Sequence, residues 1–231
     1  MFPQTQEIEI SDIADLWAVC SRNGIILEED QLAILERYHN DLVYWNKRVN
    51  LVSRKDIHHL YARHFLHSLA ILKYVDIPHK AWVIDIGTGG GLPGLPLKIA
   101  RPDIRIVLID SMAKKTKMVK MFAQHTELRD ITVRTLRAEA LADQPEYQHH
   151  FHVAVSRAVA PLVQLLSWTH PIMRPGGIVA ALKGGDLSAE IAEAQKKFPD
   201  MQIEEHLIQI AGYPWYERNQ KKIVICRYPA A

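Results

Sequence analysis

One stretch of this chain joins two apolar runs, each ending in an acidic residue, through a cluster of glycines. Residues 82–110 read WVIDIGTGGGLPGLPLKIARPDIRIVLID, with Asp85 and Asp110 closing the two runs. The pattern predicts a strand, a glycine turn, a helix and a second strand. Glycines adopt backbone conformations closed to other residues, and an acid that ends the second strand can accept the hydroxyls of a ribose. The stretch therefore indicates a site for a nucleoside cofactor.

The position of the glycines relative to the first strand bears on which cofactor is bound. Gly89, Gly91 and Gly94 match the dinucleotide fingerprint G-x-G-x-x-G, but Gly89 comes too late after Asp85 for the first turn beyond a strand. The alternative reading, in which Gly87 opens the turn, resembles motif I of class I methyltransferases, which bind S-adenosylmethionine. That resemblance favours S-adenosylmethionine over a nicotinamide dinucleotide. A glycine-rich turn without any ligand is the third possibility.

Strands and helices are expected to alternate from residue 81 onward. Alternation of this kind predicts a mainly parallel sheet with helices on both faces and a site at the carboxyl ends of the first strands. The last two strands have no helix between them, so we expect an antiparallel pair at the sheet edge. The predicted strands span 81–86, 104–110, 131–135, 151–155, 177–182, 203–209 and 222–227. The predicted helices span 93–101, 112–126, 161–173 and 187–197.

The chain before these strands, from about residue 10 to 75, is expected to be helical. Ser11 is the expected N-cap of a first helix, which Gly24 ends. Apolar residues then recur at steps of three and four between Leu32 and Val49, which is typical of one helical face. A third helical segment is expected over 58–74. We therefore divide the chain into an N-terminal helical region, 1–77, and a second domain, 78–231.

Composition narrows the classes of protein to which the chain can belong. With 231 residues, 48% hydrophobic and 23% charged, it is expected to fold around a substantial core. It has neither an apolar run of about twenty residues that would span a membrane nor the pattern of a secretory signal, so we expect a cytoplasmic protein. Cys20 and Cys226 are too far apart in sequence to suggest a metal site, and the adjacent histidine pairs lack metal-ligand spacing, so no metal is predicted.

The formal net charge of +2 hides an uneven distribution. Residues 98–137 hold ten bases and four acids, and Lys114, Lys115, Lys117 and Lys120 crowd the start of one predicted helix. Such a patch can attract an anionic polymer, although an ordinary solvated helix face has the same composition.

Seven blocks of the sequence also carry a family resemblance. In order along the chain, they are residues 45–53, 62–72, 83–97, 108–119, 137–141, 155–162 and 176–185. Together they resemble the bacterial small-subunit ribosomal RNA guanine-7-methyltransferases, also called the glucose-inhibited division protein B family. A modest departure is His67, which stands where many relatives carry an acid.

The resemblance implies a fold, a reaction and a substrate. The fold is α/β, a class I methyltransferase, Rossmann-like, seven-stranded mainly parallel sheet with an N-terminal helical extension. The reaction is methyl transfer from S-adenosylmethionine to ring nitrogen 7 of a guanine in small-subunit (16S) ribosomal RNA, free or in an assembling subunit. Two alternatives stay open, namely a catalytically inactive RNA-binding assembly factor and a methyltransferase with another substrate.

The resemblance also indicates residues for the two ligands. The candidate cofactor-binding residues are Asp85, Gly87, Gly89, Leu92, Asp110, Ala138, Glu139 and Arg157. The candidate RNA-binding residues are Arg63, His64, Lys114, Lys115, Lys117 and Lys183. No catalytic residue is assigned, because guanine nitrogen 7 carries a lone pair without a proton at neutral pH and attacks a methyl group without a general base.

Overall fold

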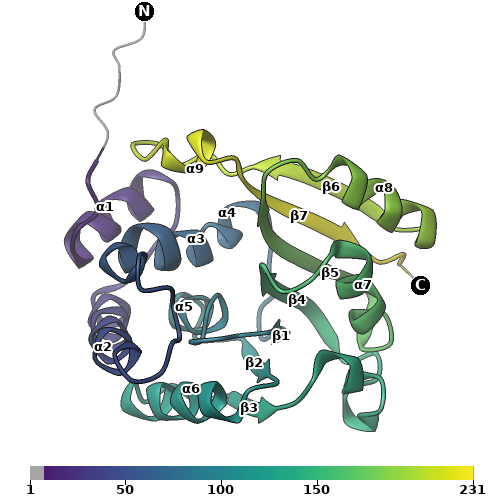
Figure 1. The fold of residues 1–231 in the computed structure, drawn as a ribbon, viewed down its shortest axis with the longest axis horizontal. Coiled ribbons are helices and arrows are strands. Elements are labelled where there is room, and N and C mark those ends of the chain that lie inside the picture. The colour runs from purple at the N-terminus through teal and green to yellow at the C-terminus, as the bar shows by residue number, and fades with distance from the viewer. Residues whose placement is uncertain (1–7, 231) are drawn as a thin grey trace, which may run out of the picture.

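The computed structural model describes residues 8–230, and the prediction that the chain lacks a secretory signal falls partly on residues outside this range. The described chain forms one seven-stranded sheet in the order β3-β2-β1-β4-β5-β7-β6 (Figure 1). Its strands are β1 Trp82–Ile86, β2 Arg105–Asp110, β3 Ile131–Thr135, β4 Phe151–Arg157, β5 Met173–Gly184, β6 Gln202–Leu207 and β7 Lys221–Arg227. All seven predicted strands are present.

Strand directions follow the prediction. Strands β1 to β5 pair in parallel. Strand β7 is antiparallel to both β5 and β6 and lies between them, which leaves β6 at the edge. The mainly parallel seven-stranded sheet and its antiparallel end are therefore confirmed. Because β1, β2 and β4 are parallel neighbours, the residues that end them share one edge of the sheet.

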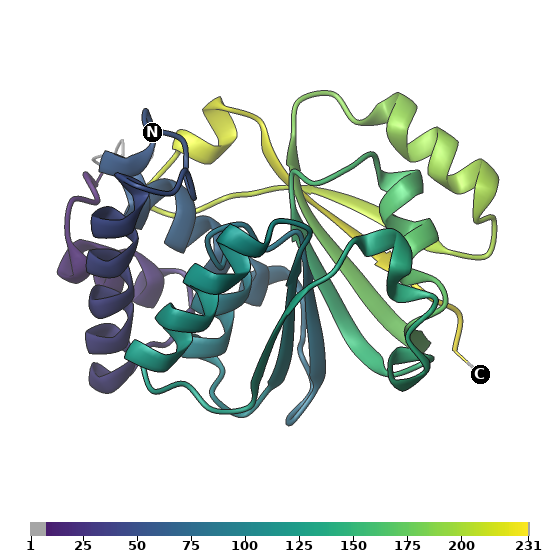
Figure 2. The same ribbon diagram turned by 60° about the horizontal axis from the view of Figure 1, so that its bottom comes forward.

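Helices cover both faces of the sheet, because side chains of a strand alternate between its faces. On β2, Ile106 and Leu108 belong to one buried cluster, and Val107 and Ile109 belong to the other. The first cluster is covered by α5 (Gly94–Ala100), α6 (Ala113–His125) and the N-terminal helices, and the second by α7 (Leu162–Thr169) and α8 (Ser188–Lys197). Figure 2 shows the two groups of helices on either side of the sheet.

The N-terminal region is helical, with two local differences from the prediction. Helix α1 (Ile13–Arg22) is capped by Asp12, whose carboxylate accepts from the Asp15 amide, so the expected Ser11 cap is wrong by one residue. Helix α2 (Glu29–Asn46) follows. The expected third helix, 58–74, is instead a succession of short pieces: 3-10 turn 57–59, π-helical turn 60–65, α3 (Leu66–Leu69) and α4 (Ile71–Tyr74).

This interrupted segment lies in the same core as the sheet. The ring of Tyr38 from α2 stacks on Phe65, with centroids 5.1 Å apart. The hydroxyl of Tyr38 donates to the carbonyl of Gly90, in the glycine loop, at 2.7 Å. The N-terminal helices therefore help to position the loop that follows β1.

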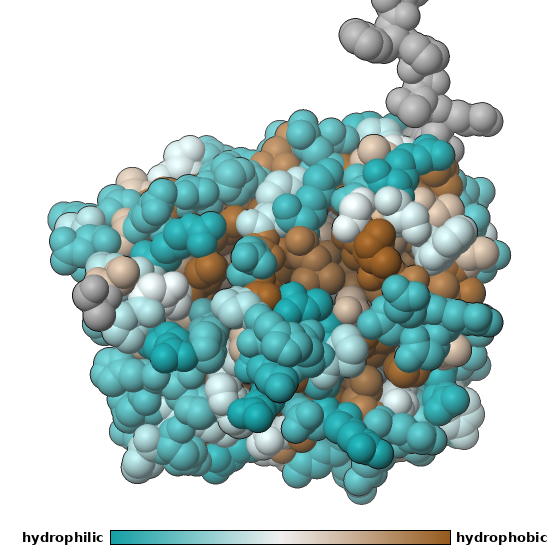
Figure 3. All heavy atoms as spheres, turned by 180° about the vertical axis from the view of Figure 1, so that it is seen from behind, coloured by the Kyte–Doolittle hydropathy of each residue, from teal (hydrophilic) through white to brown (hydrophobic). Residues whose placement is uncertain are grey.

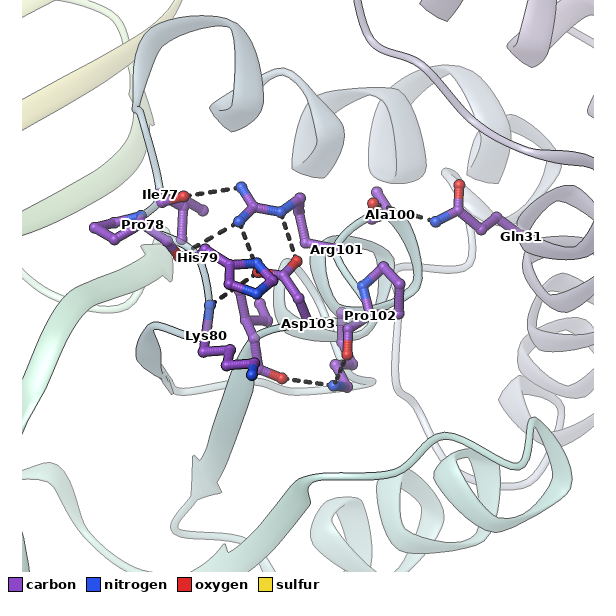
Figure 4. Close-up of polar contacts among 11 residues, drawn as sticks. Gln31, Ile77, Pro78, His79, Lys80, Ala100, Arg101, Pro102 and Asp103 are labelled. Atoms are coloured by element: carbon purple, nitrogen blue, oxygen red, sulfur yellow. Dashed lines mark hydrogen bonds and ion pairs between the residues drawn. The ribbon is translucent and has the colours of Figure 1, made fainter.

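A polar network fixes the start of β2, at the end of the strand opposite Asp110. The guanidinium of Arg101 holds the carboxylate of Asp103 through two nitrogens and also donates to the Ile77 carbonyl (Figure 4). Asp103 accepts from the backbone amide of Lys80 as well. The buried Lys98 ammonium donates to the carbonyls that follow α5. These contacts set the position of β2 and thereby of its carboxyl end.

Most residues on the face opposite to that of Figure 1 are hydrophilic. Seen from behind, hydrophobic residues gather towards the middle of that face and hydrophilic ones surround them (Figure 3). Among residues 8–230, no helix combines the length and the apolar character needed to cross a bilayer.

Candidate functional site

A cavity of about 430 Å³ opens at the carboxyl ends of β1, β2 and β4. Seven of the eight candidate cofactor-binding residues line it, and Asp85 does not. Apolar walls come from Leu51, Ile86, Ile109, Leu136 and Trp168. The seven lining candidates are Gly87, Gly89, Leu92, Asp110, Ala138, Glu139 and Arg157.

The glycine loop forms the floor of this cavity directly after β1. Gly87 and Gly89 both have positive φ, +70° and +59°, which side chains rarely adopt. A Cβ on Gly87 would also lie 2.6 Å from Cγ2 of Val159, which comes from the loop after β4. Gly94 lies away from the cavity, where a Cβ would be 2.2 Å from Leu108 Cδ2. The glycines that face the cavity thus begin at the strand end, as the motif I reading requires.

Asp85 supports the loop from behind. It is fully buried, and its Oδ2 accepts from the Thr88 hydroxyl at 2.6 Å and the Gly94 amide at 2.9 Å. Its Oδ1 is buried without a hydrogen-bond partner among the described residues. Burial outweighs these hydrogen bonds and raises the pKa of Asp85 to about 7. This carboxyl therefore organises the turn and does not face the cavity.

Asp110 ends β2 and faces the cavity. Its Oδ2 accepts from the Gly89 amide at 3.0 Å, and its Oδ1 accepts from the Met112 amide at 2.9 Å. Each carboxylate oxygen has two lone pairs, so both oxygens keep acceptor capacity for a ligand. Asp110 therefore joins the glycine loop to the start of α6 and still presents a carboxylate to the cavity.

Arg157 ends β4 on the other side of the glycine loop. Its Nη1 donates to Nδ1 of His64 at 2.6 Å, so His64 acts as an acceptor and is neutral. Burial, with the nearby charge of Arg157, lowers the pKa of His64 to about 3. Burial lowers the pKa of Arg157 from its usual value, and the nearby Tyr38 and Asp85 oppose this shift. Since Arg157 lines the cavity, its guanidinium is the candidate there for pairing with an anionic group.

The residues after β3 complete the cavity on the side of Asp110. Ala138 begins a 3-10 turn, Ala138–Leu141, and is half-buried, whereas the neighbouring Glu139 is exposed. Lys115, from the first turn of α6, also reaches this side. An apolar wall beside exposed backbone suits a flat heterocycle.

The candidate RNA-binding residues do not lie together. His64 is buried behind Arg157. Arg63 is paired with Asp56 and lies over the Trp215 ring at 4.8 Å. Lys183 is mostly buried, and its ammonium contacts Glu190 and the Ala160 carbonyl. Lys114 and Lys117 are exposed on α6, and Lys115 lines the cavity.

Residues not singled out from the sequence also line the cavity. Leu51 comes from the segment after α2, and Val159 and Trp168 come from the chain that follows β4. Leu51 lies in the family block 45–53, which could have pointed to it. Because that block contains no cofactor-binding motif, the sequence provided no reason to place Leu51 at the cavity. Within residues 8–230, no group of three or more His, Cys, Asp or Glu side chains is placed to hold a metal ion.

Comparison with known proteins agrees with this geometry. A family model described as rRNA small subunit methyltransferase G matches residues 31–220. The ribosomal RNA small subunit methyltransferase G of Roseiflexus sp. (strain RS-1) is 41% identical over 173 residues, 74% of this chain and 73% of that protein. The protein of the same name from Chlorobium phaeobacteroides is 34% identical over 222 residues, 93% of this chain and 96% of that protein.

Solved structures share the fold at low sequence identity. A SAM-dependent O-methyltransferase from Thermotoga maritima has a TM-score of 0.55 and 13% identity, covering 84% of this chain and 72% of that one. The tRNA methyltransferase TrmI of Aquifex aeolicus has a TM-score of 0.54 and 14% identity, covering 71% and 68%. These neighbours establish a class I methyltransferase fold. With the family model and the relatives, they show that this chain belongs to the rRNA small subunit methyltransferase G family.

Proposed function

We propose that this chain transfers a methyl group from S-adenosylmethionine to ring nitrogen 7 of a guanine in small-subunit ribosomal RNA. The observation that carries the proposal is the cavity at the carboxyl edge of the sheet, in a chain of this family. A strand-end carboxylate, a glycine loop and an arginine all line that cavity.

The residues present suit the chemical groups of S-adenosylmethionine. Asp110 would accept the ribose hydroxyls, because both of its oxygens keep acceptor capacity. Ala138 and Glu139, with the apolar wall of Leu136, would border the adenine. Arg157 would bind the carboxylate of the methionine part, because a guanidinium pairs well with a carboxylate. Gly87, Gly89 and Leu92 would form the floor beneath them.

Asp85 receives a different role in this account. Its Oδ2 is occupied by Thr88 and Gly94, and the residue does not line the cavity. We therefore propose that Asp85 holds the glycine loop in shape and makes no contact with the cofactor.

These assignments orient the cofactor in the cavity. The nucleoside would lie on the side of β2 and β3, where Asp110 and Ala138 are. The methionine part would lie on the side of β1 and β4, where Gly87 and Arg157 are. The target guanine must then approach the β1 and β4 side.

The reaction needs alignment from the chain more than it needs proton transfer. When bound, S-adenosylmethionine supplies an electrophilic methyl group on a sulfonium. The lone pair of guanine nitrogen 7 can attack it without a base, so the chain contributes orientation and exclusion of water. Leu51 and Val159 supply apolar surface on the side where the guanine approaches. Nitrogen 7 faces the narrow major groove of helical RNA, so a base splayed from its stack is the accessible target.

The same proposal gives a role to each of the two regions of the chain and a cellular location to the reaction. Residues 78–231 would bind the cofactor, and residues 1–77 would contribute to the RNA side. The reaction would take place in the cytoplasm, on ribosomal RNA or on the assembling small subunit.

Mapping of modified nucleosides tests this function directly. Purified protein, S-adenosylmethionine carrying a labelled methyl group, and small-subunit RNA should yield labelled 7-methylguanosine on digestion and mass spectrometry. RNA from cells that lack the protein should lose that nucleoside at one position. Absence of cofactor binding in calorimetry would favour the inactive assembly factor, and label on another acceptor would favour a methyltransferase with another substrate.

A further inference from the structure

The end of α2 and the segment that follows it carry a dense and exposed set of bases. We call it the 44–59 surface, made of Tyr44, Lys47, Arg48, Arg54, Lys55, His58 and His59, all exposed. The acid within this segment, Asp56, is already engaged by the Ser53 hydroxyl and by Arg63. None of the ion pairs found in residues 8–230 involves the lysines or arginines of the 44–59 surface. Their charges are therefore available to an anionic partner.

An aromatic ring is interleaved with these bases. Tyr44 is 53% exposed, although its ring meets that of Trp45 edge-on, with centroids 5.3 Å apart. The guanidinium of Arg48 lies 4.7 Å from the centroid of the Tyr44 ring and 5.6 Å from that of Trp45. Exposed aromatic rings beside cations are typical of surfaces that bind single-stranded nucleic acid, because bases stack on the rings while phosphates meet the charges.

The backbone of the segment is held in place by one buried side chain. The Asn46 oxygen accepts from the amides of Leu51 and Val52 at 2.8 Å and 2.9 Å, and its amide group donates to the Val52 carbonyl at 3.0 Å. A segment fixed in this way loses little conformational freedom when it binds a ligand.

The surface is also concave. A hollow of about 730 Å³ lies between α2 and the segment that follows it. Cationic or polar groups of Asn46, Lys47, Arg54 and His58 line it, together with the apolar Val43 and Ile57. This mixture suits a nucleotide, whose base is flat and largely apolar on its faces and whose phosphate is anionic.

The 44–59 surface adjoins the side of the cofactor cavity where the target must enter. Leu51, within the segment, lines that cavity, and its Cβ would lie 3.1 Å from a Cβ on Gly90. Of the α6 lysines, in contrast, Lys115 lines the cavity, at the end where Asp110 and Ala138 lie. In the proposed orientation, that end holds the nucleoside of the cofactor and not its methyl group.

We propose that the 44–59 surface binds single-stranded RNA beside the target guanine, with phosphates on Lys47, Arg48 and Arg54 and a base on Tyr44. The α6 lysines then contribute less to RNA affinity. This inference rests on the proposed function for the orientation of the cofactor, and it adds the path of the RNA across the protein.

Two sets of variants with equal change of charge test the inference. The first is Lys47→Gln, Arg48→Gln and Arg54→Gln in one protein, and the matched control is Lys114→Gln, Lys117→Gln and Lys120→Gln. Affinity for a small-subunit RNA transcript is measured from about 50 to 200 mM KCl, a range over which phosphate contacts have a large effect. Calorimetry with S-adenosylmethionine checks that both variants are folded.

We expect the first set to weaken RNA binding roughly tenfold or more and to reduce the salt slope by about 2, since each lost phosphate contact removes about 0.7 for single strands. The control should change both quantities by less than half as much. Tyr44→Ala should weaken binding about fivefold without changing the slope, because stacking releases no counterions.

Equal losses in the two sets, or a larger loss in the α6 set, would overturn the inference. If the unaltered protein transfers methyl groups to RNA in that case, the proposed function stands and only the RNA path is wrong. If the unaltered protein transfers none, the proposed function fails, whichever surface binds the RNA.

Discussion

Asp85 and Asp110 lie near the ends of neighbouring parallel strands, yet their environments differ. Asp85 is fully buried behind the glycine loop, with one oxygen unpaired and a pKa raised to about 7. Asp110 lies at the cavity and bonds the loop amide of Gly89 and the helix-start amide of Met112. One acid supports the turn from within, and the other presents a carboxylate to a ligand.

The two environments differ because the chain follows a different path after each strand. The chain after β1 turns back over Asp85, because Thr88 and Gly94 both bond its Oδ2. The chain after β2 leaves along α6, so Asp110 stays at the open edge of the sheet. The same sequence signal, an acid at a strand end, therefore has two physical outcomes.

The largest expected effect tests the enclosure of Asp85. In Gly94→Ala the new Cβ would lie 2.2 Å from Leu108 Cδ2 and 2.7 Å from Asp85 Oδ2. We expect a loss of about 3 kcal/mol in the free energy of unfolding, the upper part of the range for overpacking. Urea denaturation measures it. The control is Gly90→Ala in the same loop, whose nearest contact would be 3.1 Å. Similar losses for the two variants would mean that Asp85 is not tightly enclosed.

A second prediction uses the pKa of Asp85. The pKa of Asp85 in the folded protein, about 7, lies above its value in the unfolded chain. At pH values between the two, Asp85 is therefore protonated in the folded state and ionised in the unfolded state. Stability from this group is present below the unfolded pKa and is lost as the pH rises towards 7. Between pH 5 and 8 the unaltered protein should lose about 2 kcal/mol relative to Asp85→Asn. Unfolding curves of both proteins across that range supply the difference, and a difference that does not vary with pH would contradict the assignment.

A smaller effect, on affinity for the cofactor, is expected when His64 is replaced, because His64 accepts a hydrogen bond from Arg157. His64→Leu removes the acceptor for Nη1, and affinity for S-adenosylmethionine should fall about fivefold, or about 1 kcal/mol. His64→Asn should restore most of the affinity, because its amide oxygen can replace Nδ1. In the unaltered protein, titration of His64 should not change this affinity between pH 6 and 8, because the pKa of His64 is lowered to about 3. Failure of the Asn variant to bind better than the Leu variant would remove this positioning role.

The sequence predicted the sheet well and the interrupted N-terminal segment poorly, for physical reasons. Strands separated by turn residues and amphipathic helices have clear periodicity, and all seven strands lie where expected. Nearly every side chain from Leu60 to Ile71 is buried, so no polar face marks where one helical piece ends and the next begins. A continuous helix was therefore the wrong prediction there.

The candidate site was also only partly accessible from sequence. Strand ends and the glycine loop pointed to seven residues that line the cavity. The sequence assigned the ribose to Asp110, but it did not show that Asp85 lies behind the loop, because both acids close an apolar run. The contact between His64 and Arg157 joins residues 93 positions apart and depends on how the N-terminal helices pack. The binding roles of these residues, and the boundary at residue 77, remain predictions.

Calorimetric titration of S-adenosylmethionine into the unaltered protein, Asp110→Asn and Asp85→Asn tests the division between the two acids most directly. Melting temperatures without cofactor show which variants keep the loop folded. We predict that Asp110→Asn weakens binding tenfold or more, as expected for loss of a charged acceptor contributing about 1.5–3 kcal/mol. Asp85→Asn should change affinity by about threefold at most, since the amide oxygen of asparagine can accept from Thr88 and Gly94 in place of Oδ2. Unchanged affinity in a folded Asp110→Asn, or a larger loss in Asp85→Asn, would contradict the account.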